Sequence, residues 1–267
     1  MHPFHDFFLV FVVFNKNCEL TGEDVIHITK PGILFKYRKF DKNNLKLLLN
    51  RELWFAKPDT LNDPFEANSS FSNVLDAVWK HYPLPLDMRI KYERYLKQSL
   101  QQVGICSFSK ARKNQLMWSH YADEHKGICI GFKEEYLKKA GVSFLEADVE
   151  YQDNYPFDDI VKRIHYFEDN ECLNGFDNIC GDILLSILTT KYTSWKYERE
   201  RRLIVENFGA RKFEPLAVNS IAFGLRMKER DKKTLLTLLS GPEWSHLKWF
   251  QSTKSSIKYS LDFIRIK

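Results

Sequence analysis

The sequence predicts an α+β fold with a mainly antiparallel β-sheet and helices packed around it. Several short segments alternate apolar and polar side chains with a period of two, as half-buried strands do. Segments with helical spacing lie among them, without the regular strand–helix–strand repeat of a parallel sheet. Apolar residues make up 44% of the 267-residue chain, enough to bury a substantial core. We therefore expect residues 33–267 to form a single, catalytic-like α+β domain.

Residues 1–32 are expected to be an N-terminal extension or a first strand. Their apolar run at 7–14 is far shorter than the about 20 residues that a membrane span needs. The residues ahead of this run lack the basic charges of a signal peptide. No membrane association is therefore expected.

The first elements of the domain are predicted from alternation and from capping residues. Residues 33–38 alternate as a half-buried strand does and place Arg38 near the strand exit. Asp41 can cap the short helix that follows, and residues 52–56 have the composition of another strand. Residues 58–66 then form a polar loop with two prolines and an Asn-Asp-Pro turn.

The remaining elements are expected in chain order, with breaks at prolines and glycines. Helices are predicted at 74–81, 87–102, 114–122, 133–140, 182–192 and 229–239. Strands are predicted at 103–109, 127–132, 142–151, 195–205, 218–225 and 257–263. Residues 152–175 are expected to be loop with a short helix.

Composition limits the classes of function. The formal net charge is +5, from 40 basic and 35 acidic residues, too evenly mixed for the broad basic surface of a duplex-binding protein. It permits an anionic ligand. The five cysteines show no C-x-x-C spacing, which indicates reduced, buried thiols of a cytoplasmic protein. His120 and His125 stand five positions apart, on neither one helical face nor one strand face, so no metal pair is expected.

Residues 195–205, W-K-Y-E-R-E-R-R-L-I-V, carry the most informative pattern. In an extended chain, Glu198, Glu200 and Arg202 would share one face, with the two carboxylates roughly 7 Å apart. Such a pair can divide its labour, one acid stabilising positive charge and the other accepting a proton. In a helix, Glu198 and Arg202 would instead form a solvent-facing ion pair. The local residues alone leave both arrangements open.

Six motifs resemble those of the bacterial domain of unknown function 2971 family, and the resemblance covers residues 34–226. They are L-F-K-Y-R at 34–38, L-N-D-P-F-E at 61–66, C-S-F-S at 106–109, M-W-S-H-Y-A at 117–122, K-G-I-C-I-G-F at 126–132 and W-K-Y-E-R-E-R-R-L-I at 195–204. More loosely, the order Arg, Ser, Glu-x-Glu resembles that of mono-ADP-ribosyltransferases. That resemblance implies a split β-sheet that grips NAD.

The transferase resemblance also implies roles for individual residues. Arg38 would hold the NAD phosphates, and Ser107 or Ser109 would order the nicotinamide ribose site. Glu200 would bond a ribose hydroxyl and stabilise the oxocarbenium ion, while Glu198 would assist the acceptor nucleophile. These transferases carry a Ser-Thr-Ser type motif, and this chain departs from it with Phe at the middle position.

Four aromatic side chains are candidates to stack on nicotinamide or adenine: Tyr37, Trp118, Tyr121 and Trp195. Each functional interpretation has a structural alternative. An aromatic pair with the spacing of Trp118 and Tyr121 is more often core than ligand platform. Arg38 can pair with Glu198 or Glu200 as a structural ion pair, and Arg202 can orient the two acids.

The predicted function is an NAD-consuming ADP-ribosyltransferase or NAD glycohydrolase that needs no metal. A role as a toxin or anti-phage defence effector follows only from association with such bacterial families. One alternative is a Mg²⁺-dependent nuclease using Asp63, Glu66, Glu198 and Glu200, because hard cations prefer oxygen ligands. Another is a non-catalytic binding module. The sequence leaves open the acceptor (protein, nucleic acid, small molecule or water) and any homo-oligomer or regulatory partner.

Overall fold

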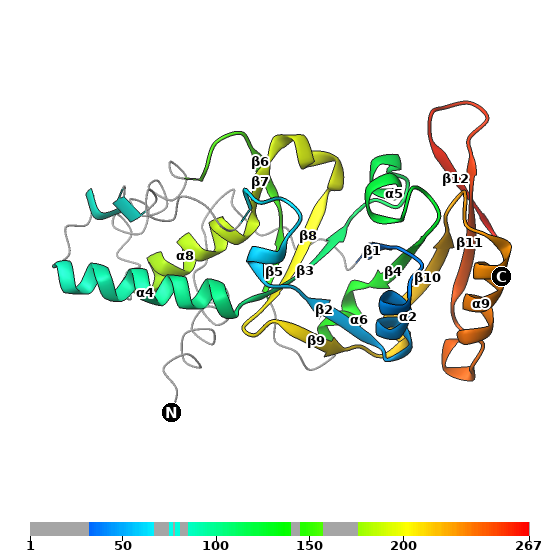
Figure 1. Cartoon of the computed structure of the whole chain (residues 1–267), viewed down its shortest axis with the longest axis horizontal. Helices are drawn as coiled ribbons and strands as arrows, with labels where there is room; N and C mark the ends of the chain where they lie inside the picture. The colour runs from blue at the N-terminus through cyan, green and yellow to red at the C-terminus, as the bar shows by residue number, and fades with distance from the viewer. Residues whose placement is uncertain are drawn as a thin grey trace.

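A mostly antiparallel eight-stranded β-sheet organises the chain (Figure 1). The computed structural model describes residues 32–66, 75–76, 78–80, 85–139, 145–156 and 176–266, with backbone alone at 138–139, 176–179 and 182. The sheet order is β12-β11-β10-β4-β1-β3-β8-β5. Its strands are β1 (Ile33–Arg38), β3 (Gly104–Ser109), β4 (Ile128–Lys133), β5 (Leu145–Asp148), β8 (Glu200–Val205), β10 (Val218–Phe223), β11 (Lys248–Lys254) and β12 (Leu261–Arg265). Within this sheet only β10 and β11 pair in parallel, so the α+β class with a mainly antiparallel sheet is confirmed.

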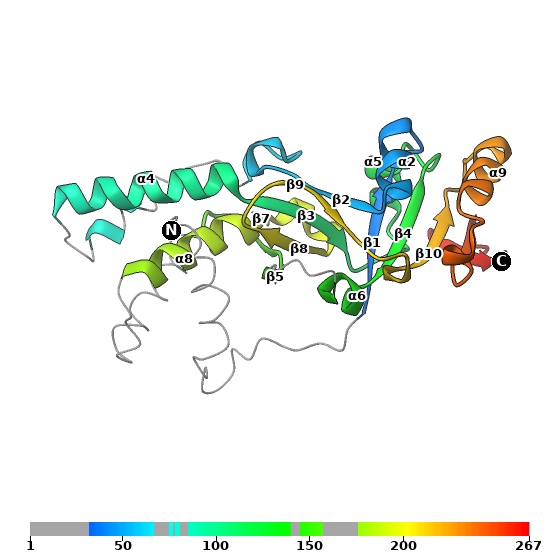
Figure 2. The ribbon, with the colours of Figure 1, turned by 90° about the horizontal axis from the view of Figure 1, so that it is seen from below.

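The sheet is divided into two wings at the junction of β1 and β3. These strands share one register pair, Phe35 with Ser109, whereas β1 pairs with β4, and β3 with β8, along their whole lengths. Figure 2 shows that β1, β4 and β10 run steeply across the direction of β3 and β8. We call β12 to β1 the first wing and β3, β8 and β5 the second wing.

Two short sheets flank the main one. Strand β2 (Glu52–Phe55) pairs antiparallel with β9 (Gly209–Lys212). Strand β6 (Glu150–Gln152) pairs in parallel with β7 (Thr190–Tyr192), which sets Tyr151 opposite Lys191. This second pairing builds one side of the site described below.

Capping side chains explain where two of the helices begin. Asp41 accepts a hydrogen bond from the Asn44 amide (2.8 Å), as its predicted cap role requires, and Asn114 caps α5 in the same way. The α-helices are α2 (Lys42–Leu49), α4 (Leu86–Gln102), α5 (Gln115–Tyr121), α6 (Glu134–Lys139), α8 (Phe176–Thr189) and α9 (Glu229–Leu238). The 3-10 helices are η1 (Pro58–Thr60), η2 (Thr193–Glu198), η3 (Pro215–Ala217) and η4 (Pro242–Trp244). No described helix is long and apolar enough to cross a membrane.

The buried apolar side chains of the described residues form three clusters, because successive strand residues face opposite sides of the sheet. One fills the face of the sheet that carries Leu34 and Leu203 and is covered by α2, α6 and α9. A second joins α4 and α8 to the opposite face of β3 and β8, which carries Ile204. A third lies beneath α5 and surrounds Trp118, which is fully buried.

Several predicted boundaries were wrong for identifiable reasons. The strand predicted at 195–205 begins only at residue 200, because η2 occupies the preceding residues and Arg199 adopts a left-handed conformation (φ 47°). The strand predicted at 257–263 begins at residue 261, since Ile257 and Tyr259 lie in an exposed turn between β11 and β12. The predicted helix at 182–192 ends at residue 189, where the chain enters β7. The expectations for 1–31 and 157–175 lie outside the described residues.

Candidate functional site

Three carboxylates from separate segments meet at the side chain of Lys191. The Nζ atom of Lys191 lies 2.7 Å from a Glu66 oxygen, 2.7 Å from a Glu198 oxygen and 3.4 Å from a Glu200 oxygen. Glu66 ends the loop of residues 58–66, Glu198 ends η2 and Glu200 begins β8. All four side chains are buried.

Arg202 supplies the second buried cation. Its Nε donates to Glu200 Oε1 (2.8 Å), one terminal nitrogen bonds both Glu200 (3.2 Å) and Glu66, and the other donates to the Leu188 carbonyl (2.6 Å). We call Glu66, Lys191, Glu198, Glu200 and Arg202 the acid–lysine cluster. Buried charges are tolerated only where the geometry of such pairs offsets the loss of hydration.

The turn at Arg199 lets the acid pair face inward from two different elements. Glu198 is the last residue of η2, and Arg199 reverses the chain locally in the left-handed region while its own side chain stays exposed. Strand β8 then starts at Glu200, whose side chain shares a strand face with Arg202. The two glutamates are only 3% and 4% exposed, so the solvent-facing helical alternative is wrong.

Hydroxyl groups complete the surroundings of the acids. Tyr121 Oη donates to Glu198 Oε1 (2.5 Å), and Ser109 Oγ donates to the Glu198 carbonyl (2.6 Å). Tyr151 Oη accepts the amide hydrogen of Glu200 (2.7 Å), and the Ser107 hydroxyl helps to lower the pKa of the Glu200 carboxyl. These contacts hold both glutamates in position from three different elements, α5, β3 and β6.

The two acids of the pair have pKa values shifted in opposite directions. Burial raises the pKa of Glu198 above its ordinary value, although Lys191 partly opposes the shift. Burial also acts to raise the pKa of Glu200, but the charges of Arg202 and Lys191 outweigh it and lower that pKa to about 2. Burial alone would lower the pKa of Lys191, yet the three carboxylates raise it, so its ammonium keeps its proton. Carboxylates whose environments separate their pKa values are suited to different chemical roles.

A pocket of about 650 Å³ adjoins the cluster. Glu66 and Lys191 line it directly, whereas Glu198 and Glu200 lie behind them. The Trp195 ring lies 4.8 Å from the Lys191 ammonium and forms part of the wall. The other lining residues are Asn62, Asp63, Pro64, Phe65, Gln152, Asp153, Asn154, Tyr155, Pro156, Ile187, Thr190, Tyr192 and Ser194.

The structure brings together six of the predicted site residues and separates Arg38, Tyr37 and Trp118 from them. Ser107, Ser109, Tyr121, Glu198 and Glu200 lie in one connected network, and Trp195 joins it through Lys191.

Two of the predicted aromatic platforms lie elsewhere. Tyr37 and Trp118 pack edge to face (5.4 Å between ring centroids) in the core beneath α5. Because Trp118 is completely buried, it leaves no ring face for a ligand.

Arg38 does not join the acid pair. It shares a strand face with Leu34 and Lys36, while the pairing of Phe35 with Ser109 places the serine and its partner Glu200 on the opposite face. Among the described residues, Arg38 forms no ion pair with an acid of the cluster. Lys191 and Arg202 are the cations that neutralise the pair.

Sequence reasoning missed Lys191 entirely. Its segment, T-T-K-Y-T-S-W, directly follows an apolar helix, and a lysine there is the only local signal. The nuclease alternative placed Mg²⁺ among Asp63, Glu66, Glu198 and Glu200. The Lys191 ammonium occupies the point where three of these acids meet, and the described residues contain no group of three His, Cys, Asp or Glu side chains arranged to hold a metal ion.

Residues 117–203 match the family model described as Protein of unknown function (DUF2971). The matched range runs from α5 into β8 and contains Tyr121, Lys191, Glu198, Glu200 and Arg202. The match supports the resemblance to the domain of unknown function 2971 family, whose description states no activity. No curated protein and no solved structure matches the chain.

Proposed function

We propose that this chain binds NAD in the pocket beside Lys191 and cleaves the bond between nicotinamide and ribose, passing ADP-ribose to an acceptor or to water. One observation carries the proposal. Two carboxylates with oppositely shifted pKa values share a lysine that also lines a dinucleotide-sized pocket.

The pocket suits a nucleotide in size and chemistry. Its volume of about 650 Å³ lies within the range of small-molecule sites. Tyr155, Tyr192 and Trp195 on its wall can stack on nicotinamide or adenine. Among the carboxylates of the acid–lysine cluster, Glu66 lines the pocket directly and can accept hydrogen bonds from ribose hydroxyl groups.

The opposite pKa shifts divide the chemical work. When the N-glycosidic bond breaks, its electron pair goes to the nicotinamide nitrogen, which neutralises the pyridinium, and positive charge develops on the ribose. Glu200 stays ionised at neutral pH and stabilises that charge. As the acceptor bonds to the ribose carbon, it loses a proton, and Glu198 is the carboxyl whose raised pKa suits it to take that proton.

The direct test is to incubate the full chain with NAD and follow nicotinamide release by chromatography, with and without EDTA. The proposal predicts release that EDTA leaves unchanged. A parallel incubation with single-stranded and duplex nucleic acid plus Mg²⁺ tests the nuclease alternative, which predicts cleavage that EDTA abolishes. Nicotinamide release at the rate of a protein-free control would reject the proposal.

A specific observation favours one other function, a non-catalytic binding module. Every acid of the cluster is paired with a cation, and both glutamates of the pair are shielded from the pocket. In that case the cluster fastens β7, η2 and β8 together and shapes the pocket without turning over a ligand. NAD that binds the chain but releases no nicotinamide would support this alternative.

A further inference from the structure

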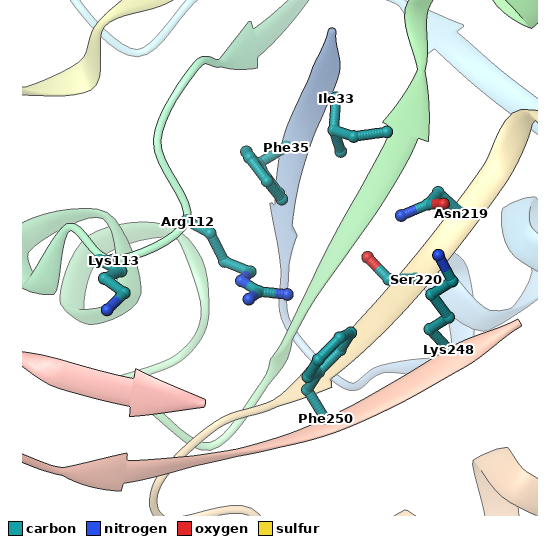
Figure 3. Close-up of a pocket in the computed structure, with 8 residues that line it drawn as sticks. All are labelled: Ile33, Phe35, Arg112, Lys113, Asn219, Ser220, Lys248 and Phe250. Carbon is teal, nitrogen blue, oxygen red and sulfur yellow. The ribbon is translucent and has the colours of Figure 1, made fainter. Parts of the chain in front are cut away.

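A second pocket, of about 410 Å³, lies on the first wing (Figure 3). Its lining residues are Ile33, Phe35, Arg112, Lys113, Asn219, Ser220, Lys248 and Phe250. None of them lines the pocket beside Lys191. This pocket is therefore separate from the one beside Lys191.

Sheet register builds the floor of this pocket. Phe35, Gly131, Ser220 and Lys248 are aligned across β1, β4, β10 and β11, so their side chains share one face of the sheet. Glycine keeps the floor open, because a Cβ atom at Gly131 would lie 2.6 Å from Ser220 Oγ. The hydroxyl of Ser220 is thus left facing the pocket.

A β-bulge adds a second polar group to the same face. The register of β10 against β4 shifts between Val218 and Ser220, which leaves Asn219 as the extra residue. Bulges redirect side chains in this way. Figure 3 shows the Asn219 amide and the Ser220 hydroxyl entering the pocket from β10.

Arg112 approaches from the loop between β3 and α5. Its guanidinium lies 4.4 Å from the ring centroids of both Phe250 and Phe263, and a third ring, Phe35, is 5.9 Å away. These cation–π contacts stabilise the guanidinium without using its N–H groups as hydrogen-bond donors. In the described part of the chain no acid pairs with Arg112 and no hydrogen bond uses its guanidinium.

The charge around the pocket is strongly positive. Lys113 and Lys248 join Arg112 in the lining, and no lining residue is acidic. The nearest described ion pair, between Lys113 and Asp262 (3.6 Å), is at the exposed rim. Because Lys113 already has Asp262 as a partner, Arg112 and Lys248 are the two lining cations without an acid among the described ion pairs. A phosphate monoester, which carries close to two negative charges at neutral pH, matches them better than a single carboxylate does.

We propose that this pocket binds a phosphate monoester of a small apolar or aromatic group. The phosphate oxygens accept hydrogen bonds from Arg112, Lys248 and Ser220, since the guanidinium fork matches phosphate geometry. The organic part lies against Ile33, Phe35 and Phe250. A volume of about 410 Å³ leaves room for it beside the phosphate.

The test is isothermal titration calorimetry of the full chain with phenyl phosphate at constant ionic strength. Arms with inorganic phosphate and benzoate separate the contributions of the charge and the ring. Phenyl phosphate should bind at one saturable site, more tightly than either. Equal binding of benzoate, or no saturable binding of phenyl phosphate, would overturn the proposal, and equal binding of inorganic phosphate would overturn the assigned organic part.

Variants locate the site. Arg112→Gln should weaken phenyl phosphate binding by about tenfold or more, because a charge-assisted pair is lost. Lys248→Gln removes an exposed side chain without disturbing the core, and it should weaken binding several-fold even if Arg112→Gln folds poorly. The control, Lys97→Gln, alters an exposed lysine on α4 and should bind as the wild type does. Unchanged affinity in Lys248→Gln and in a folded Arg112→Gln would place the anion elsewhere.

Discussion

Lys191 holds together the largest group of buried charges in the described site. Replacing it with Met would leave Glu66, Glu198 and Glu200 with Arg202 as their only close cation in the cluster. Removing one partner of a buried ion pair typically costs about 3–5 kcal/mol in the free energy of unfolding. We expect Lys191→Met to lose an amount of this size in urea denaturation.

Lys196→Met is the matched control for this variant, since Lys196 is an exposed residue of η2, five positions away in the chain. Its stability should stay close to that of the wild type. If the two variants unfolded at the same urea concentration, the acid–lysine cluster would contribute nothing to the fold.

Lys36 is a second buried lysine, and it makes the free energy of unfolding depend on pH in the alkaline range. Burial lowers its pKa from 10.5 to about 8, against opposing contributions from Cys106. Because the unfolded chain binds this proton more tightly, the contribution of Lys36 to stability rises as pH increases from about 8 to 10.5. The gain across that window is on the order of 3 kcal/mol.

The measurement compares the unfolding free energies of the wild type and Lys36→Met at pH 7.5 and pH 10. The wild type should gain stability relative to Lys36→Met as the pH rises. The exposed Lys39→Met should show no such relative change. A wild type that lost stability relative to Lys36→Met over this range would contradict the assigned pKa direction.

At the residue scale, the sequence predicts that Glu198 and Glu200 face the same way. The cations that pair with them are Lys191 and Arg202, whereas the sequence favours Arg38. The position of Arg38 near a strand end favours it as the cation beside the acids. Because Phe35 pairs with Ser109, Arg38 lies on the face of the sheet opposite to Ser109 and Glu200. This pairing joins distant segments, so no local sequence pattern predicts it. Lys191 reaches the acids through the pairing of β6 with β7, which is equally non-local.

Among the elements, the transition from η2 to β8 determines the position of the acid pair. Arg199 occupies the left-handed region, which costs a non-glycine residue roughly 1 kcal/mol, and its exposed side chain is in none of the described ion pairs. Arg199→Gly should therefore keep or raise the melting temperature, and Arg199→Val should lower it, because a β-branched residue fits this conformation least well.

Thermal unfolding of the two variants checks this prediction. A melting temperature for Arg199→Val at or above that of Arg199→Gly would mean that the left-handed turn does not form. The strand predicted across 195–205 would then be correct after all. Alternation could not reveal the turn, because Glu198 and Glu200 face inward in either geometry.

Over the whole molecule, the fold class followed from sequence while the arrangement of strands did not. Periodicity predicted most of the strands of the main sheet, since half-buried strands alternate whatever their neighbours are. The order β12-β11-β10-β4-β1-β3-β8-β5 joins segments far apart in the chain and depends on long-range packing. The division at β1 and β3 separates Arg38 on the first wing from Glu200 on the second. An ADP-ribosyltransferase architecture stays a prediction.

The measurement that most directly tests the NAD proposal is nicotinamide release by Glu200→Gln at saturating NAD. The glutamine keeps the shape and some hydrogen bonds of the carboxylate but removes its charge. Release should therefore fall by about 10²-fold or more while NAD still binds. Glu135→Gln, an exposed change on α6, should release nicotinamide at the wild-type rate. A folded Glu200→Gln that releases nicotinamide as fast as the wild type would show that the acid pair is an ion-pair network and not a catalytic site.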